Sequence, residues 1–505
     1  EGVMGGYNRL NGEAACGSHH LITEILREKW GFDGYYVSDC GAIKDFHMHH
    51  GLTDTPQESA ALALKSGCDL NCGAVYLHVM SAYNQGLVSE DDIDRAVTHL
   101  MMTRMRLGMF DQHTEFDEIP YEVNDCAEHH SLSLKAAEES MVLLKNDGIL
   151  PLDKAKLKTV AVIGPNSDSE EILKGNYNGT ATEKYTLLEG IRAVLGKDTR
   201  IFCSEGAHLY RDNVENLAEA DDRIKEAVSM AMRSDVVFLC LGLNGTLEGE
   251  EGDANNSYAG ADKVDLNLPE SQMRLLKAVC ETGTLVILLL STGSAMAINE
   301  ADEHCSAILQ VWYPGQMGGL AAARLLMGEA VPSGRLPVTF YRTTEELPDF
   351  TDYSMKGRTY RYMEHEALYP FGYGLSYGDF EYSNLKAEQL ETGQIKLSVE
   401  ITNHSMFECD EVAEVYVRIT DSELAAPGGS LADFKRIHLK AGESAAAAFI
   451  LSAKAFMVVN EEGEFVFDGS AAVVTCGGSQ PDGRSVELTG KTPLKLDLKL
   501  EDLKW

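Results

Sequence analysis

The sequence predicts a multidomain α/β protein in three blocks: a β-α-β-α block, an open three-layer α/β domain and a small β-sandwich. Three observations lead to this prediction. The 505 residues correspond to roughly three domains at about 150 residues each. Short apolar strands alternate with amphipathic helices up to about residue 345, which indicates parallel sheets. From about residue 380, apolar and polar residues alternate with period two, which is typical of half-buried strands.

The first block shows strands and helices in alternation. A strand is predicted at 34–39, a helix at 55–66, a strand at 67–72 and a helix at 89–109. The acidic run Glu90-Asp91-Asp92 favours the start of the second helix, since negative side chains are stabilised at a helix N-terminus. This order predicts a parallel sheet, either an open one or the closing part of a barrel.

The second block repeats the pattern after a polar segment and a turn at Pro120. Its predicted strands lie at 159–164, 200–203, 236–243, 285–291 and 307–312, and Gly315, Gly318 and Gly319 open its last helix. We therefore expect a separate open α/β domain. In the third block, the alternating runs at 396–401 and 411–417 predict a β-sandwich.

Charge and apolar runs exclude several classes of protein. A formal net charge of -36 leaves no basic face to neutralise phosphates, so nucleic acids and anionic membranes are poor partners. The longest apolar run, 284–290, is far shorter than the roughly 18 to 20 residues of a membrane span. Eleven cysteines are too sparse for a disulfide scaffold. We expect a soluble protein with a neutral substrate.

Asp39 is the first candidate for chemistry. It ends the apolar run 35–38, and function in parallel βα domains concentrates at the C-terminal ends of strands. The alternative interpretation is that Asp39 caps the N-terminus of the next helix. The residues around Asp39 decide between these two interpretations.

Motifs along the chain, beginning around Asp39, resemble glycoside hydrolase family 3. The segments VMGGYNRLNG (3–12) and WGFDGYYVSD (30–39) are similar to the stretch around the nucleophile of that family. Further similar segments follow in the family's order at 142–146, 150–152, 161–165, 332–337 and 368–377. The resemblance implies the C-terminal part of a (β/α)8 barrel, a three-layer α/β sandwich and a fibronectin-III-like β-sandwich. We place these at 1–115, 141–345 and 381–505, with linkers at 116–140 and 346–380.

The resemblance also implies a retaining exo-β-glycosidase. Such enzymes use one carboxylate as nucleophile and one carboxylic acid as proton donor, about 5 to 5.5 Å apart. Asp39 matches the nucleophile, and the acid of the family comes from a loop of the second domain, which matches LNGTLEGEEGD at 243–253. A Glu three residues before an Asp selects Glu250 as general acid/base, while a Thr-x-Glu-x-Glu pattern also fits Glu248.

The acidic character of this loop supports a proton donor. Four acids lie within six positions, at 248, 250, 251 and 253. Their mutual repulsion is expected to raise the pKa of at least one of them, as a general acid requires. The alternative interpretation is a solvated acidic loop.

Further residues are candidates for contacts with the sugar. Tyr7 and Arg9 lie at the end of the first predicted strand, where the family has sugar-contacting side chains; the alternative for either is packing at the rim. We also count Glu248 among the substrate contacts. The histidine clusters at 19–20, 47–50 and 129–130 lack a carboxylate partner pattern for a metal. No G-x-G-x-x-G motif follows a strand, so we expect neither metal nor cofactor.

Cys40 and Cys72 bear on which sugar is bound. Many β-glucosidases of the family have Trp directly after the nucleophile, where this chain has Cys40, and Cys72 ends the next predicted strand. Matching ends of adjacent parallel strands, about 4.8 Å apart, suit the Cα separation of a disulfide. Such a bridge would crowd the sugar pocket and favour a sugar without the C6 hydroxymethyl group. The alternative interpretation is that both cysteines are unpaired structural thiols. We therefore prefer a β-xylosidase, which the resemblance at 38–40, 70–73 and 175–179 also implies, over a β-glucosidase.

The start of the chain leaves other interpretations open. It begins at Glu1 and its opening residues match the middle of a domain, so we expect a missing N-terminal segment and leave the compartment, cytoplasmic or secreted by a bacterium, undecided. A barrel of about 250 residues cannot close from the roughly 110 present unless a further segment or a second chain, as in a homo-oligomer, completes it. Alternatives are an inactive fragment, a non-catalytic carbohydrate-binding protein and a nucleotide-binding α/β protein, the last weakened by the missing phosphate loop.

Overall fold

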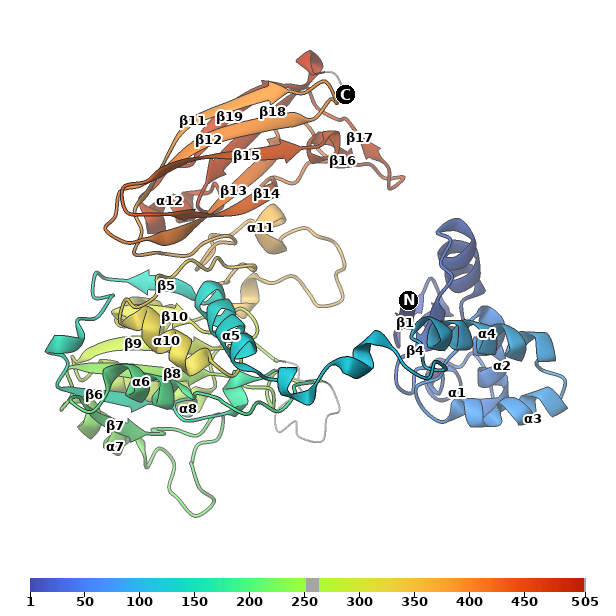
Figure 1. Ribbon diagram of the computed structural model, residues 1–505, viewed down its shortest axis with the longest axis horizontal. Coiled ribbons are helices and arrows are strands. Elements are labelled where there is room, and N and C mark those ends of the chain that lie inside the picture. The colour runs from blue at the N-terminus through green and yellow to red at the C-terminus, as the bar shows by residue number, and fades with distance from the viewer. Residues whose placement is uncertain (176, 251–262, 504–505) are drawn as a thin grey trace. The chain divides into compact units, whose positions relative to one another are not determined.

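The computed structural model describes residues 1–175, 177–250 and 263–503. The chain forms two compact units, Glu1–Val123 and Asn124–Trp505, whose elements are labelled in Figure 1. Within these described ranges, no helix combines the length and the apolar character that crossing a membrane requires.

The first unit is built on parallel strands followed by helices. Strand β1 (Gly2–Gly5) pairs in parallel with β4 (Tyr35–Ser38), with Gly5 opposite Ser38 at the C-terminal end. A single parallel bridge joins Val37 of β4 to Leu70. The prediction of a parallel β-α-β-α block is confirmed, but the strand expected at 67–72 consists of this one bridge.

Four helices of the first unit pack around Tyr36 of β4, namely the π-helix η2 (His20–Lys29), α1 (Asp45–Met48), α2 (Pro56–Ser66) and α3 (Val79–Asn84). Helix α4 (Glu90–Arg106) packs through Ala96 against α2 in a second cluster. The hairpin of β2 (Arg9–Leu10) and β3 (Glu13–Ala14) precedes the helices. Thr55 and Ser89 begin α2 and α4 with capping boxes, which satisfy free N–H groups of the first turn. Helix α4 ends at Arg106 rather than at the predicted Met109, because the chain turns at Gly108 with φ 70°.

The second unit begins with a six-stranded sheet in the order β5-β10-β9-β8-β6-β7. Its strands are β5 (Val142–Asn146), β6 (Thr159–Ile163), β7 (Arg200–Ser204), β8 (Val236–Gly242), β9 (Leu285–Ser291) and β10 (Ala307–Gln310). Neighbouring strands are parallel except β5, which runs antiparallel to β10. The five strands predicted in this block are confirmed, whereas no strand was predicted for β5 at the sheet edge.

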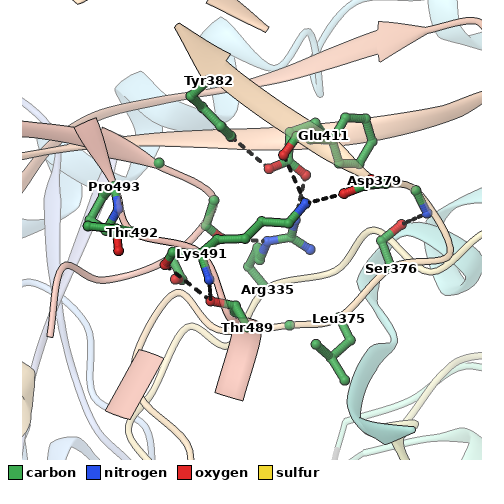
Figure 2. A pocket seen from close by; sticks show the side chains of 16 residues that line it. Arg335, Leu375, Ser376, Asp379, Tyr382, Glu411, Thr489, Lys491, Thr492 and Pro493 are labelled. Carbon is green, nitrogen blue, oxygen red and sulfur yellow. Dashed lines mark hydrogen bonds and ion pairs between the residues drawn. The ribbon is translucent and has the colours of Figure 1, made fainter. Parts of the chain in front are cut away.

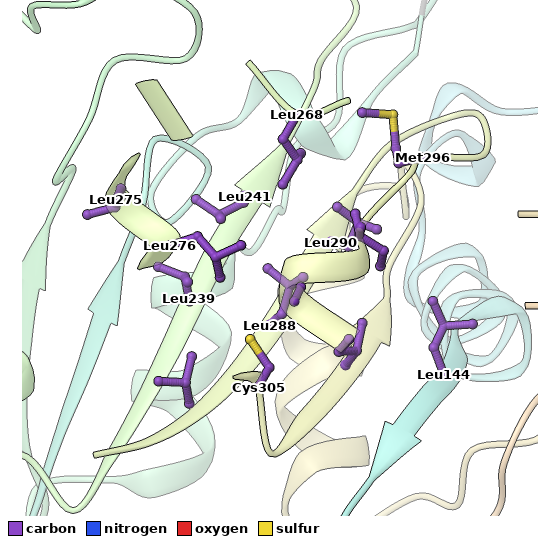
Figure 3. Close-up of a cluster of buried hydrophobic side chains, with 14 of the residues drawn as sticks. Leu144, Leu239, Leu241, Leu268, Leu275, Leu276, Leu288, Leu290, Met296 and Cys305 are labelled. Carbon is purple, nitrogen blue, oxygen red and sulfur yellow. The ribbon is translucent and has the colours of Figure 1, made fainter. Parts of the chain in front are cut away.

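Helices pack on both faces of this sheet, which makes the predicted three layers. One face carries α5 (Ala127–Ser140), α6 (Leu187–Leu195) and α10 (Gly318–Leu326), and the other carries α7 (Ile224–Ala231), α8 (Glu270–Cys280) and α9 (Asn299–His304). Along β8, Leu239 and Leu241 point into one core and Phe238 into the other, because successive side chains of a strand alternate between its faces. Figure 3 shows the first core, where Leu288 of β9 packs with Leu239 and Leu241.

Helices α6 and α10 meet through their backbones at two glycines. A Cβ on Gly190 would lie 1.9 Å from the carbonyl oxygen of Gly319, and a Cβ on Gly319 would lie 1.9 Å from that of Thr186. A side chain at either position would therefore push the two helices apart. Helix α5, which also packs against α10, lies in the segment predicted as the first linker, and α11 (Thr359–Tyr362) lies in the second.

The last part of the second unit is a β-sandwich, as predicted. One sheet has the order β11-β12-β15 and the other β14-β13-β18-β19. The elements are β11 (Phe380–Gln389), β12 (Ile395–Asn403), β13 (Cys409–Ile419), β14 (Ser430–Leu439), β15 (Ser444–Leu451), β16 (Val458–Val459), β17 (Phe465–Val466), β18 (Ala471–Gly477), α12 (Gly483–Thr489) and β19 (Leu494–Lys499). Along β12 every second side chain is buried, which is the period of two seen in the sequence.

Short 3-10 helices complete the chain. They are η1 (Ala15–Gly17), η3 (Val75–His78), η4 (Glu115–Glu118), η5 (Tyr121–Val123), η6 (Lys154–Lys156), η7 (Glu171–Leu173), η9 (Thr344–Glu346), η10 (Ala453–Phe456) and η11 (Leu500–Asp502). Each makes about one turn, the usual length of this helix type.

Buried charges join the sandwich to the α/β domain within the second unit. The Arg335 guanidinium donates to Glu411 Oε2 of β13 at 2.7 Å, and both side chains are buried. Tyr382 of β11 donates its hydroxyl to Glu411 Oε1 at 2.6 Å. Figure 2 shows these side chains around a cavity of about 230 Å³, with Lys491 paired to Asp379 at 2.7 Å. The charged side chains named here are thus paired with one another.

Glu414 of β13 gives this junction a predicted pH dependence. Burial raises the pKa of its carboxyl to about 7 from the ordinary value of 4.5, although the Tyr416 hydroxyl, which donates to Glu414 at 2.7 Å, and Arg335 oppose the shift. The folded state therefore holds this proton more tightly than the unfolded state. The resulting stabilisation, about 3 kcal/mol, is complete below about pH 4.5 and is lost as the pH rises through about 7.

We expect Glu414→Gln to remove most of this dependence, because the amide has no proton to lose. Between about pH 5 and pH 8, the free energy of unfolding should fall less in Glu414→Gln than in the wild type, as measured by denaturant unfolding. Glu461→Gln, an exposed change in the same sandwich, serves as the control and should behave as the wild type. The same pH dependence in Glu414→Gln and in the wild type would contradict the prediction.

Candidate active site

Asp39 lies at the C-terminal end of the parallel strands of the first unit. Its backbone N–H donates to the Gly5 carbonyl oxygen at 2.8 Å, and the N–H of Ser38 donates to the Leu70 carbonyl oxygen at 2.9 Å. Asp39 is thus fixed between two neighbouring segments and is partly exposed. Side chains at this edge of a parallel βα structure are the ones that usually carry function.

The carboxylate of Asp39 and the phenol of Tyr7 both contact Cys40. Asp39 Oδ1 accepts a hydrogen bond from the Cys40 N–H at 2.7 Å, and the Tyr7 hydroxyl donates to the Cys40 carbonyl oxygen at 3.0 Å. The structure therefore brings three of the predicted residues together. Because β1 ends at Gly5, Tyr7 and Arg9 lie beyond it, and Arg9 begins the β2 hairpin with an exposed side chain.

Cys40 and Cys72 form a disulfide between the end of β4 and the segment after Leu70. Their Cα atoms are 4.4 Å apart, so of the two interpretations that the sequence left open, a bridge or unpaired thiols, the structure shows the bridge. The backbone around it is also fixed, because the Gly41 N–H donates to the Cys72 carbonyl oxygen at 2.8 Å and Ser38 Oγ accepts from the Cys72 N–H at 3.0 Å. The role of Ser38 was not predicted; its signal was a hydroxyl within an otherwise apolar strand.

The second candidate carboxyl group lies on the loop that follows β8. Asn244 Oδ1 accepts hydrogen bonds from the Thr246 N–H and hydroxyl at 3.0 and 2.7 Å, which turns the chain directly after the strand. Glu248 and Glu250 come next. The other two acids of the predicted cluster, at 251 and 253, lie outside the described residues.

Glu250 is exposed and contacts a phenol from another loop. The Tyr177 hydroxyl donates to Glu250 Oε2. Tyr177 has φ 55°, a left-handed conformation that is uncommon for an aromatic residue. This contact was not predicted, since the segment 175–179 indicated only a resemblance to β-xylosidases and 73 positions separate the two residues.

Glu248 is largely buried, and donors surround its carboxylate. Oε2 accepts from the Gly293 N–H at 2.7 Å and from the Tyr313 hydroxyl at 2.5 Å, and Oε1 accepts from the Ser294 hydroxyl. Lys263 Nζ lies 3.6 Å from Oε1, and only 12% of the Glu248 side chain is exposed. Burial lowers the pKa of Lys263 and raises that of Tyr313; the charge of Glu248 opposes the first shift and adds to the second.

Three known domain families match the chain. The Glycosyl hydrolase family 3 N terminal domain matches residues 1–103, the Glycosyl hydrolase family 3 C-terminal domain matches 141–377, and the Fibronectin type III-like domain matches 411–480. These matches follow the order of the parallel block, the α/β sandwich and the β-sandwich described above.

Characterised proteins and solved structures agree with these matches. A xylan 1,4-β-xylosidase of Xylanibacter ruminicola is 31% identical over 88% of this chain and 68% of its own length. A periplasmic β-glucosidase of Salmonella typhimurium is 31% identical over 91% of this chain and 64% of its own length. The structure of a GH3 exo-β-xylosidase in complex with a xylobiose aziridine probe superposes with a TM-score of 0.85 at 26% identity, covering 99% of this chain and 65% of that one. The chain thus spans about two-thirds of the length of these proteins.

Proposed function

Because the chain belongs to glycoside hydrolase family 3, we propose that it is the part of a retaining exo-β-glycosidase that supplies both catalytic carboxyl groups. Asp39 is the nucleophile and Glu250 the general acid/base. The substrate is an oligosaccharide with a terminal non-reducing β-D-xylosyl residue, and a β-D-glucosyl residue is the alternative. The observation that carries the proposal is the position of Asp39 at the C-terminal end of β4, beside the Cys40–Cys72 bridge.

The proposed reaction is a double displacement. In the first step, an Asp39 oxygen attacks the anomeric carbon while Glu250 gives its proton to the glycosidic oxygen, so the sugar becomes an ester of Asp39 and the alcohol leaves. In the second step, the ionised Glu250 takes a proton from water, whose oxygen attacks the anomeric carbon and frees the Asp39 carboxylate. Two inversions give a product with retained configuration.

The surroundings of the two glutamates support Glu250 as the acid. Glu250 is exposed at the surface, where its carboxyl, which accepts a hydrogen bond from Tyr177, can meet a substrate. Glu248 is buried, and three protein groups donate to its carboxylate, so a leaving group reaches it less easily than it reaches Glu250. A general acid must come within hydrogen-bond reach of the atom that it protonates.

The disulfide supports xylose as the preferred sugar. Cys40 follows the nucleophile directly, and its bond to Cys72 places two sulfur atoms beside Asp39. Xylose has a hydrogen where glucose has a hydroxymethyl group, so it needs less room in a crowded pocket. One such group typically changes discrimination by about 1 to 3 kcal/mol.

The direct test compares an aryl β-xyloside with the matching aryl β-glucoside, using the protein as its gene encodes it. We expect kcat/KM for the xyloside to exceed that for the glucoside by about tenfold or more. A preference for the glucoside would select the β-glucosidase alternative. Binding of xylo-oligosaccharides without hydrolysis of either glycoside would select the non-catalytic alternative.

Opening the bridge should shift this preference. In the double variant Cys40→Ser with Cys72→Ala, space appears beside Asp39, so kcat/KM for the glucoside should rise relative to the xyloside by roughly tenfold. The ratio of the two kcat/KM values measures the effect independently of the amount of active enzyme. Cys126→Ser, at a free cysteine outside the first unit, is the control. An unchanged ratio in the double variant would mean that other residues select the sugar.

A further inference from the structure

We infer that Glu248 is a positioning residue that holds the loop carrying the general acid Glu250. The inference rests on the proposed role of Glu250 and extends it to a second glutamate with a different task. The contacts that carry it come from three segments that are distant in the sequence, which are the turn after β9, the turn after β10 and Lys263.

The first argument is the completeness of the contacts around the Glu248 carboxylate. One backbone N–H and two hydroxyl groups donate to it, and an ammonium group lies 3.6 Å away. Hydrogen bonds to a charged group are stronger than those between neutral groups, and they fix its geometry. Since Glu248 lies only two positions before Glu250, fixing the first carboxylate restricts where the second can lie.

The second argument is that the donors themselves sit on rigid structure. Gly293 and Ser294 follow β9, and the Thr292 hydroxyl donates to the Ser294 carbonyl oxygen at 2.9 Å. The buried amide of Gln310, the last residue of β10, donates to the Thr292 carbonyl oxygen at 3.0 Å. The turn that binds Glu248 is therefore tied to the neighbouring strand of the sheet. Catalytic groups need such support, because a site on an unsupported loop is poorly placed.

The third argument is the backbone conformation directly before Tyr313. Trp312 has φ 59°, in the left-handed region that is uncommon for residues other than glycine. Its indole N–H donates to the Ser140 carbonyl oxygen at 3.0 Å, which holds the ring in this conformation. Strained residues of this kind persist where the surrounding structure fixes them, and they gather at functional sites. Here the strained residue directly precedes Tyr313, whose hydroxyl donates to Glu248.

Lys263 adds a further contact to the same turn. Its ammonium group donates to the Ser294 hydroxyl and to the Ala295 carbonyl oxygen, the latter at 3.0 Å, so it contacts the same turn as Glu248. Glu248 and Lys263 are thus both attached to the turn after β9.

The test uses the leaving group of the substrate. Protonation by a general acid accelerates the departure of poor leaving groups, such as a second xylose, and matters little for activated ones, such as dinitrophenol. We expect Glu248→Gln to lower kcat/KM for xylobiose by about 10- to 100-fold, as displacement by about 1 Å does, and to lower it much less for dinitrophenyl β-xyloside. Tyr313→Phe removes a single hydroxyl. It should also lower kcat/KM more for xylobiose than for dinitrophenyl β-xyloside, with smaller losses than in Glu248→Gln. Glu303→Gln, at an exposed position of α9, is the matched control and should leave both rates unchanged.

Three outcomes would overturn the inference. Equal losses on both substrates in Glu248→Gln and Tyr313→Phe would show a general effect on the fold, and unchanged kinetics would show that the anchor is dispensable. Rescue of Glu248→Ala by azide, without rescue of Glu250→Ala, would make Glu248 itself the acid. The two proposals fail separately. If Glu250→Ala shows the leaving-group dependence and Glu248→Gln does not, only the positioning role is wrong, whereas Glu250→Ala without that dependence would overturn the proposed role of Glu250 itself.

Discussion

Asp39→Ala is expected to abolish turnover, with a loss in kcat on the order of 10⁴-fold or more, as removal of a nucleophile does in other enzymes with covalent intermediates. Without the carboxylate, no ester forms and the reaction has no second step. The measurement is hydrolysis of an aryl β-xyloside by the protein as its gene encodes it. Asp39→Asn, which keeps the shape of the side chain, should lose a similar factor.

Added azide separates this role from a general loss of structure. In Asp39→Ala, a small anion can take the place of the missing carboxylate and attack the substrate directly, so any sugar azide formed should have inverted configuration. Asp54→Asn, at an exposed position of the same unit, is the control and should keep wild-type rates. Wild-type activity in Asp39→Ala would eliminate the assignment, and a product azide with retained configuration would show that another residue is the nucleophile.

Glu250→Ala is expected to have the second largest effect, and the size should depend on the substrate. For poor leaving groups, the rate should fall by about 10²- to 10⁴-fold, the usual contribution of general acid–base catalysis. For dinitrophenyl β-xyloside, formation of the ester should be nearly unaffected and its hydrolysis slow, because no base activates water. Steady-state turnover should therefore be limited by the second step, with a burst of dinitrophenol before it.

Azide should restore turnover in this variant. It attacks the ester without needing a base, and the product should be a sugar azide of retained configuration, opposite to that from Asp39→Ala. The two variants thus identify the two roles by the stereochemistry of their products. If Glu250→Ala loses the same factor on every substrate and azide has no effect, the acid/base is another residue.

Local pattern was enough to predict most of the second unit. Strands β6, β8 and β9 are short apolar runs bounded by turns, and their side chains face cores on both sides of the sheet, so the sequence of each strand reflects its burial. The Cys40–Cys72 bridge was also predictable, because parallel pairing brings matching strand ends together. Strand β5 was not, since its pairing partner β10 lies far along the chain and runs in the opposite direction.

The contacts of Glu248 could not be predicted from local sequence patterns either, because its partners are also distant along the chain. Gly293 and Tyr313 bind Glu248 across 45 and 65 positions, and their own sequence surroundings give no sign of a shared partner. An acidic loop by itself is most often solvated. Only the fold shows that Glu248 is buried among three donors, whereas Glu250 is exposed and accepts from Tyr177.

The edge strand β5 is synthesised long before the segments with which it pairs. Besides β10, it pairs with a segment much later in the chain: the Leu375 N–H donates to the Leu143 carbonyl oxygen at 2.8 Å, and the Tyr373 hydroxyl donates to the Leu144 carbonyl oxygen across 229 positions. At the usual rate of synthesis, about 5 to 20 residues per second, β5 leaves the ribosome roughly 10 to 50 s before its last partner. Until β10 has been made, the apolar residues of β5 have neither neighbour, and a chaperone that binds short apolar strands could occupy this segment.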